Sequence, residues 1–210
     1  MGRQTVLEAV KINHRYERRA LWTRPLSFTW EAPRAIAITG PNGAGKSTLL
    51  SIVGGLLRPT EGRVSFSFAG MRLSAGSWRQ LIAWLSPHLY PPADLTIQHL
   101  LQSYIRFKGL LLSAGFLEEI QLQARLNAPL SHLSSGQRQR LLLALTLALQ
   151  RPILILDEPT AFLDEYWKAF FHDRLRKVIE KGQTLLLCAT NDPSEAALFP
   201  ENLYLGFYAT

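Results

Sequence analysis

The feature that most constrains this chain is a glycine-rich segment, Gly40 to Thr48, which reads Gly-Pro-Asn-Gly-Ala-Gly-Lys-Ser-Thr. Residues 34–39, Arg-Ala-Ile-Ala-Ile-Thr, precede it and predict a buried strand, and the pattern of 46–56 predicts a helix. Glycine tolerates positive φ, so this segment can turn tightly between the predicted strand and the predicted helix, with its backbone N–H groups pointing into the loop. Short apolar runs alternate with helical patterns elsewhere too. We therefore predict an α/β fold around a largely parallel sheet.

The same segment matches the phosphate-binding pattern G-x-x-x-x-G-K-[ST] in the strand–helix context that the pattern requires. Inward N–H groups, a helix N-terminus and the Lys46 ammonium all favour a polyphosphate, and the Ser47 hydroxyl is placed to bind Mg²⁺. A glycine-rich turn that matches by chance is the alternative, and the flanking strand and helix argue against it. The predicted nucleotide contacts are Gly40, Pro41, Asn42, Gly43, Ala44, Gly45, Lys46, Ser47 and Thr48.

The remaining pattern predicts one domain over 1–210. Core strands are expected at 81–85, 152–156 and 184–188, and alternating apolar residues at 5–12, 26–30 and 63–68 favour a small antiparallel sheet near the N-terminus. Strand signals vanish between 88 and 136. We interpret 88–136 as an inserted helical lobe, and 1–87 with 137–210 as the nucleotide-binding core.

Composition narrows the class of protein. The net charge of +7 favours an anionic partner, which nucleotide, nucleic acid or an anionic membrane surface would each satisfy. Cys188 is the single cysteine and lies in an apolar run, so we expect a buried thiol and no intramolecular disulfide. The longest apolar stretch, 141–149, is about half a membrane span. We expect a cytoplasmic protein that needs a partner for any membrane role.

Two acids end the apolar run 153–156. In phosphate-loop NTPases an aspartate at the end of this strand holds Mg²⁺, which predicts that role for Asp157. Glu158 follows directly, where its carboxylate can act as general base on an attacking water. An ordinary Asp-Glu pair at a strand end is the alternative, and the phosphate-binding segment upstream disfavours it.

Leu133-Ser-Ser-Gly-Gln137 resembles the signature motif of ABC ATPases, and a leucine-rich helical pattern continues it to Gln150. Ser134 and Gln137 also have the spacing of a capping box, a structural role compatible with function. Pro159 to Asp164 is similar to the D-loop of this family. The resemblance implies that Ser134, Gly136 and Gln137 contact the γ-phosphate of ATP held by the opposite subunit.

Three further positions follow from the resemblance. Tyr16 stands where the family often has an aromatic residue against adenine, although core packing would equally explain it. The family usually has a glutamine after the strand 81–85, and His88 is the nearest polar substitute here. The family histidine after the strand 184–189 is replaced by Asn191, which can donate a hydrogen bond but carries no charge. Asn191 could instead cap a helix that begins near Pro193. We take Glu158, Lys46, Asn191 and His88 as catalytic candidates.

The resemblance implies an ABC-type ATPase with a P-loop NTPase core, similar to small exporter ATPases. It further implies ATP and Mg²⁺ as cofactors, a second ABC ATPase subunit (a copy or a paralogue) and an integral membrane permease on the inner face of the cell membrane. Nucleic acid is not an expected partner. A soluble relative acting on nucleic acid or ribosomes is one alternative, and a nucleotide-gated regulatory module with low turnover is another.

Overall fold

The computed structural model describes residues 4–17, 19–87 and 89–206. Its centre is a five-stranded parallel sheet in the order β11-β5-β10-β9-β8. These strands are β5 (Arg34–Thr39), β8 (Ile82–Leu85), β9 (Ile153–Asp157), β10 (Leu185–Ala189) and β11 (Glu201–Tyr204). The parallel core predicted from the apolar runs is confirmed. The edge strand β11 was not predicted, since three of its four residues are exposed and its sequence lacks the apolar run of the inner strands.

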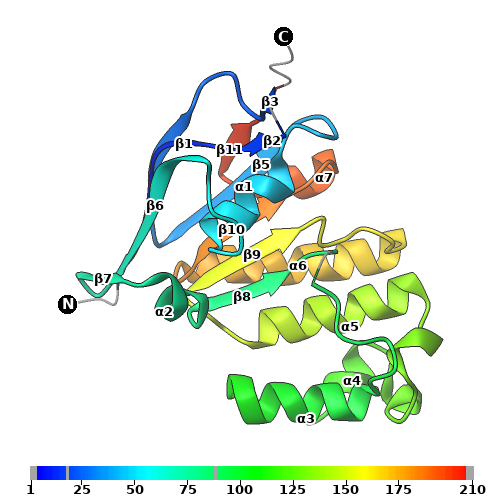
Figure 1. Cartoon of the computed structure of the whole chain (residues 1–210). Coiled ribbons are helices and arrows are strands. Elements are labelled where there is room, and N and C mark those ends of the chain that lie inside the picture. The colour runs from blue at the N-terminus through cyan, green and yellow to red at the C-terminus, as the bar shows by residue number, and fades with distance from the viewer. Residues whose placement is uncertain (1–3, 18, 88, 207–210) are drawn as a thin grey trace.

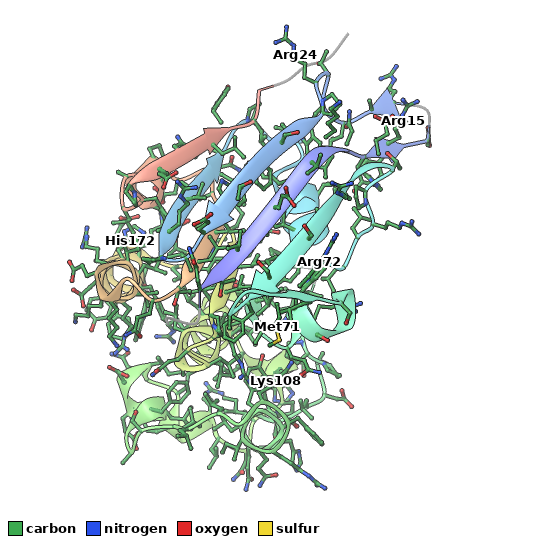
Figure 2. The ribbon with its side chains drawn as sticks, turned by 90° about the vertical axis from the view of Figure 1, so that its left-hand side faces the viewer. Arg15, Arg24, Met71, Arg72, Lys108 and His172 are labelled. Atoms are coloured by element: carbon green, nitrogen blue, oxygen red, sulfur yellow. The ribbon has the colours of Figure 1, made fainter. Side chains whose placement is uncertain are left out.

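A second, antiparallel sheet has the order β4-β1-β6-β7 and forms the N-terminal part of the molecule (Figure 2). It consists of β1 (Thr5–Asn13), β4 (Leu26–Glu31), β6 (Glu61–Phe68) and β7 (Met71–Leu73). A short hairpin of β2 (Arg15–Tyr16) and β3 (Arg19–Ala20) projects from the end of β1. The predicted antiparallel sheet is therefore confirmed.

Helices cover the parallel sheet and extend away from it (Figure 1). They are α1 (Lys46–Val53), α2 (Ala75–Arg79), α3 (Ile97–Lys108), α4 (Phe116–Glu119), α5 (Ser135–Ala148), α6 (Glu165–Lys181) and α7 (Pro193–Ala196). Two 3₁₀ turns, Gln123–Arg125 and Leu130–His132, lie between α4 and α5. The segment interpreted as a helical lobe holds α3 and α4, which lie at the bottom of Figure 1.

The two faces of the parallel sheet bury different cores, because side chains alternate along a strand. On β9, Leu154 and Leu156 face the cluster that includes α5 and α6, whereas Ile153 and Ile155 face α1 and the antiparallel sheet. Both faces being covered explains why the inner strands are continuous apolar runs rather than alternating ones. Cys188 is fully buried in the first cluster, and burial raises the pKa of its thiol. The predicted buried thiol is confirmed.

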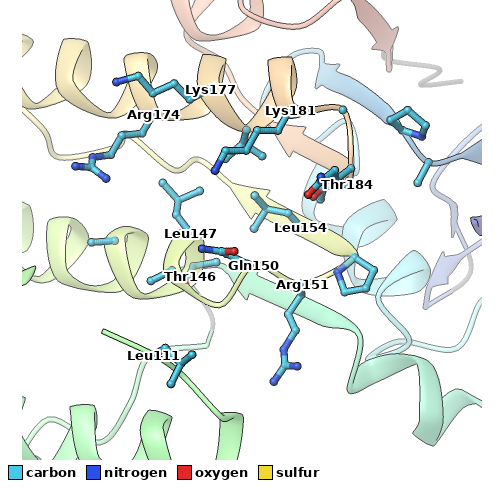
Figure 3. Close-up of a pocket in the computed structure, with 18 of the residues that line it drawn as sticks. Leu111, Thr146, Leu147, Gln150, Arg151, Leu154, Arg174, Lys177, Lys181 and Thr184 are labelled. Carbon is cyan, nitrogen blue, oxygen red and sulfur yellow. The ribbon is translucent and has the colours of Figure 1, made fainter. Parts of the chain in front are cut away.

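A cavity of about 1010 Å³ opens between the ends of α5 and α6 (Figure 3). Leu111, Leu147, Leu154, Lys177 and Lys181 are among the residues that line it. None of the described residues around this cavity belongs to the predicted nucleotide site. None of the described helices combines the length and the apolar composition that a membrane span requires.

Candidate nucleotide-binding site

The glycine-rich segment joins β5 to α1 and has the backbone that its sequence requires. Gly40, Gly43 and Gly45 have φ of 143°, 84° and 90°, which other residues rarely adopt. A Cβ added to Gly40 would lie 2.0 Å from the carbonyl oxygen of Leu205, so no larger residue fits there. The segment therefore keeps its backbone close-packed and wraps around the N-terminus of α1, an arrangement suited to an anion.

Lys46, the first residue of α1, turns back over this segment. Its ammonium donates to the carbonyl oxygens of Gly40 (2.9 Å) and Pro41 (3.3 Å) and to Oδ1 of Asn191 (2.9 Å). The residue is only 7% exposed. The cation is thus held directly beside the glycine-rich backbone, where it can meet an incoming phosphate.

Oxygen donors gather beside Ser47. The Ser47 hydroxyl donates to Oδ1 of Asp157 at 3.0 Å, and the Ser86 hydroxyl donates to Oδ2 of the same carboxylate at 3.3 Å. Mg²⁺ prefers oxygen ligands and keeps most of its coordination for water and phosphate, so one hydroxyl and one carboxylate suffice from the protein. The donor set fits Mg²⁺. Ser86 was not predicted to lie here, although it occupies the first position after β8, where the family pattern is altered.

Glu158 and Asn191 meet next to Lys46. The amide Nδ2 of Asn191 donates to Oε1 of Glu158 (2.9 Å) and to Oδ1 of Asn42 (2.8 Å). Desolvation by burial raises the pKa of the Glu158 carboxyl, and the backbone N–H of Asn191 and the charge of Lys46 partly oppose the rise. A carboxylate with a raised pKa is a better proton acceptor at neutral pH than an exposed one.

Topology explains why these side chains converge. β5, β10 and β9 are adjacent and parallel, and Gly40, Asn191 and Asp157 lie at or just beyond their carboxyl ends. Ligands of open α/β sheets bind at this edge. The structure therefore brings together the phosphate-binding segment, both acids and Asn191, which lie as far as 151 positions apart in the sequence (191 − 40).

The capping alternative for Asn191 does not hold. The N-cap of α7 is Asp192, whose carboxylate accepts hydrogen bonds from the backbone N–H groups of Ser194 and Glu195. Hydrogen bonds from Ser194 lower the pKa of Asp192. Asn191 is thus free of the capping task and points to Lys46 and Glu158 instead.

Of the two remaining site candidates, Tyr16 lies within the described residues and His88 does not. Tyr16 is 54% exposed, and its hydroxyl lies 3.1 Å from Oγ1 of Thr48. It is therefore not a core residue, and it stands at the rim of the glycine-rich segment.

The signature-like residues lie at the N-terminus of α5. Ser134 and Gln137 form the predicted capping box, with Ser134 Oγ accepting from the Gln137 N–H at 3.2 Å and Gln137 Oε1 accepting from the Ser134 N–H at 3.0 Å. A Cβ on Gly136 would lie 2.8 Å from the carbonyl oxygen of Phe162, so this position needs glycine. No hydrogen bond among the described residues connects Ser134, Gly136 or Gln137 with the glycine-rich segment of their own chain.

These features define the chain as a P-loop nucleotide-binding protein of α/β architecture. Comparison with known proteins identifies the family: the "ABC transporter" family model matches residues 23–161, so the chain belongs to the ABC transporter family. It is 37% identical over 177 residues to the cytochrome c biogenesis ATP-binding export protein of Rhizobium johnstonii, covering 80% of each chain. It is 32% identical over 168 residues to the Nod factor export ATP-binding protein I of Burkholderia lata, covering 77% of this chain and only 55% of that protein.

Solved structures agree with the fold. A dimeric ATP-binding cassette in a post-hydrolysis state bound to ADP and phosphate superimposes with a TM-score of 0.80 at 22% identity, covering 97% of both chains. An ATP-binding subunit of an ABC transporter superimposes with a TM-score of 0.81 at 25% identity, covering 97% of this chain and 88% of that one. The family model and the relatives confirm the predicted family and its ATPase activity. The solved structures confirm the predicted fold class.

Proposed function

We propose that this chain is the ATP-hydrolysing subunit of a membrane exporter, with Glu158 as general base and Lys46 and Asn191 as phosphate contacts. The observation that carries the proposal is the hydrogen-bonded chain from Lys46 through Asn191 to Glu158, built on the glycine-rich segment. It links the proposed phosphate-binding cation, Lys46, to the proposed general base, Glu158. A structural role for Asn191 alone does not account for its hydrogen bonds to both Lys46 and Glu158.

Ser47 and Asp157 are the residues that would hold Mg²⁺. The ion, when bound, neutralises charge that develops on the transferred phosphoryl group. Lys46 adds a fixed positive charge beside the glycine-rich segment, whose N–H groups would bind phosphate oxygens. Glu158 then accepts the proton of the attacking water, while Asn191 orients the Glu158 carboxylate through its amide.

A second subunit would complete the site. Ser134 and Gly136 present a helix N-terminus that suits an anion, and they make no hydrogen bond to their own phosphate loop among the described residues. A head-to-tail dimer would place each signature-like helix against the ATP of its mate, with the same two surfaces meeting twice. The mate is a second copy or a paralogue.

The names of the two relatives support an exporter rather than a protein that acts on nucleic acid or ribosomes, since both names describe ATP-binding export proteins. The proposed partner is an integral membrane permease, which would place the chain at the inner face of the cell membrane. One observation supports the alternative of a nucleotide-gated regulatory module with low turnover. The neutral Asn191 lies beside Glu158, at a position where the resemblance implies a histidine. Sustained phosphate release would exclude that alternative.

Lys46→Ala tests the proposal. Because the ammonium is the cation that hydrogen-bonds to the phosphate-binding segment, we expect ATP affinity to fall by orders of magnitude with the fold retained. Calorimetric titration of wild type and variant measures the affinities, and equal values would contradict the assignment. Proteins that co-purify with the chain from gently solubilised membranes would identify the permease, and recovery of nucleic acid instead would contradict the exporter role.

A further inference from the structure

The turn that carries Glu158 is held in an unusual backbone conformation. Glu158 has φ of 49° and Phe162 has φ of 66°, both in the left-handed region that residues with a side chain rarely occupy. Such conformations persist only where surrounding contacts fix them, and they gather at functional sites. Some neighbouring element must therefore hold residues 158–162 in place.

The first turns of α5 are that element. Gln139 is 2% exposed, and its amide Nε2 donates to the carbonyl oxygen of Pro159 at 2.7 Å and to that of Glu158 at 3.3 Å. One turn earlier, Gly136 packs so closely on the Phe162 carbonyl that no Cβ fits. One residue later, the Arg140 guanidinium lies 4.2 Å from the centre of the Trp167 ring. The same face of α5 thus contacts 158–167 at three successive points.

The other end of the Gln139 amide fixes its orientation. Oε1 accepts a long hydrogen bond from the Tyr90 hydroxyl at 3.4 Å. A donor on that side keeps the amide NH₂ pointing at the two carbonyl groups, since an amide has its donors and its acceptor on opposite sides. The Arg138 guanidinium lies 5.9 Å from the centre of the Tyr90 ring.

We propose that Gln139 is a positioning residue for ATP hydrolysis, which holds the backbone of the Glu158 turn so that the Glu158 carboxylate stays aimed at the attacking water. This inference rests on the proposed role of Glu158 as general base. Gln139 itself touches neither Lys46 nor the phosphate-binding segment in any hydrogen bond among the described residues. It therefore acts on the rate of hydrolysis and not on ATP binding.

The size of the effect follows from the geometry of the turn. The backbone N–H of Glu158 is fixed by the Ala189 carbonyl at 2.8 Å, so loss of the Gln139 contacts frees mainly the carbonyl side of the turn. Misplacement of a catalytic group by about 1 Å can reduce a rate by about 100-fold. We expect Gln139→Leu to lower kcat by about 10- to 100-fold with ATP affinity within about twofold of wild type.

Thr146→Val is the matched control. Thr146 lies on the same helix, is also 2% exposed, and its hydroxyl donates only to Leu142 within α5, at 2.7 Å. Both substitutions remove a buried polar group from α5. Thr146, however, lies two helical turns beyond Gln139 along α5, away from residues 158–162. Thr146→Val should leave kcat unchanged at a similar cost in Tm.

Tyr90→Phe provides a second variant that leaves Gln139 in place. It removes the donor that orients the amide without a change in the core, so kcat should fall by about 2- to 10-fold, as for the loss of a neutral hydrogen bond. This variant keeps the proposal testable if Gln139→Leu fails to fold.

Steady-state phosphate release with the full-length chain tests the proposal, with calorimetric ATP affinities measured in parallel. In a Glu158→Gln background, Gln139→Leu should cause no further loss of rate, because residues that act as one unit are not additive. Equal losses of kcat in Gln139→Leu and Thr146→Val would assign the effect to helix stability and overturn the inference. A wild-type rate in Glu158→Gln would instead overturn the proposed function, so the two failures are distinguishable.

Discussion

Asn191 connects the phosphate-binding cation to the proposed base, so its replacement by histidine perturbs both ends of the site. In the structure, Oδ1 of Asn191 accepts from Lys46 at 2.9 Å, and Nδ2 donates to Glu158 at 2.9 Å and to Asn42 at 2.8 Å. All three partners belong to the proposed site for the γ-phosphate and its attacking water. An imidazole at this position can carry a proton, which an amide cannot.

The magnitude follows from the strength of a charged donor. A bound triphosphate favours the protonated imidazole, and charge-assisted hydrogen bonds are about twice as strong as neutral ones. A gain of about 1 to 2 kcal/mol at the transition state raises the rate by about 5- to 30-fold. We therefore expect slow basal hydrolysis in the wild type, and a kcat in Asn191→His that is higher by that factor.

Steady-state phosphate release by wild type, Asn191→His and Asn191→Ser measures the effect, with the membrane partner present once it is known. ATP affinity should change little in Asn191→His, because Lys46 retains its contacts with Gly40 and Pro41. Asn191→Ser should be slower than wild type, since the shorter hydroxyl leaves Glu158 without its amide donor. A histidine variant no faster than wild type would remove Asn191 from the catalytic residues.

Two further predictions concern the dimer surface and a buried acid. Ser134→Arg should abolish ATP-driven dimerisation, because the long arginine side chain at the α5 N-terminus fills the proposed phosphate contact. Calorimetry should still find ATP binding by the monomer. A dimer that survives would contradict the head-to-tail arrangement. Glu195 is 1% exposed, and desolvation by burial raises the pKa of its carboxyl from 4.5 to about 7, so its contribution to the free energy of unfolding is full below pH 4.5 and is lost as pH rises to about 7 and above. In urea titrations, Glu195→Gln should have about the same free energy of unfolding as wild type at pH 4 and a higher one at pH 8, by about 3 kcal/mol. Equal differences at both pH values would show that Glu195 does not titrate in this range.

The parallel core was predictable because its inner strands are buried on both faces, which leaves unbroken apolar runs such as 35–38 and 153–156 in the sequence. The phosphate-binding segment was predictable for a related reason, since its glycines and Lys46 occur at fixed spacing. β11 escaped prediction because its side chains are mostly exposed and its position depends on hydrogen bonds to β5, which no local pattern encodes.

The supporting residues of the site were harder to infer. Gln139 looks like one more polar residue of a leucine-rich helix, and only the packing of α5 against 158–162 shows what its amide contacts. Ser86 likewise reaches Asp157 because β8 and β9 are neighbours in the sheet. The sequence alone did not separate a site role for Asn191 from a helix-capping role. The structure separates them, because Asp192 occupies the N-cap of α7.

The mass of Glu158→Gln in solution with saturating Mg-ATP tests the proposed base and the proposed dimer together and most directly. This variant keeps every proposed binding contact and lacks the proposed base, so the ATP-bound dimer should accumulate instead of being released by hydrolysis. Gel filtration with light scattering should report twice the 23.7 kDa of the chain, together with a phosphate-release rate lower by about 10²- to 10⁴-fold. A monomer that hydrolyses ATP at the wild-type rate would contradict both the base and the dimer.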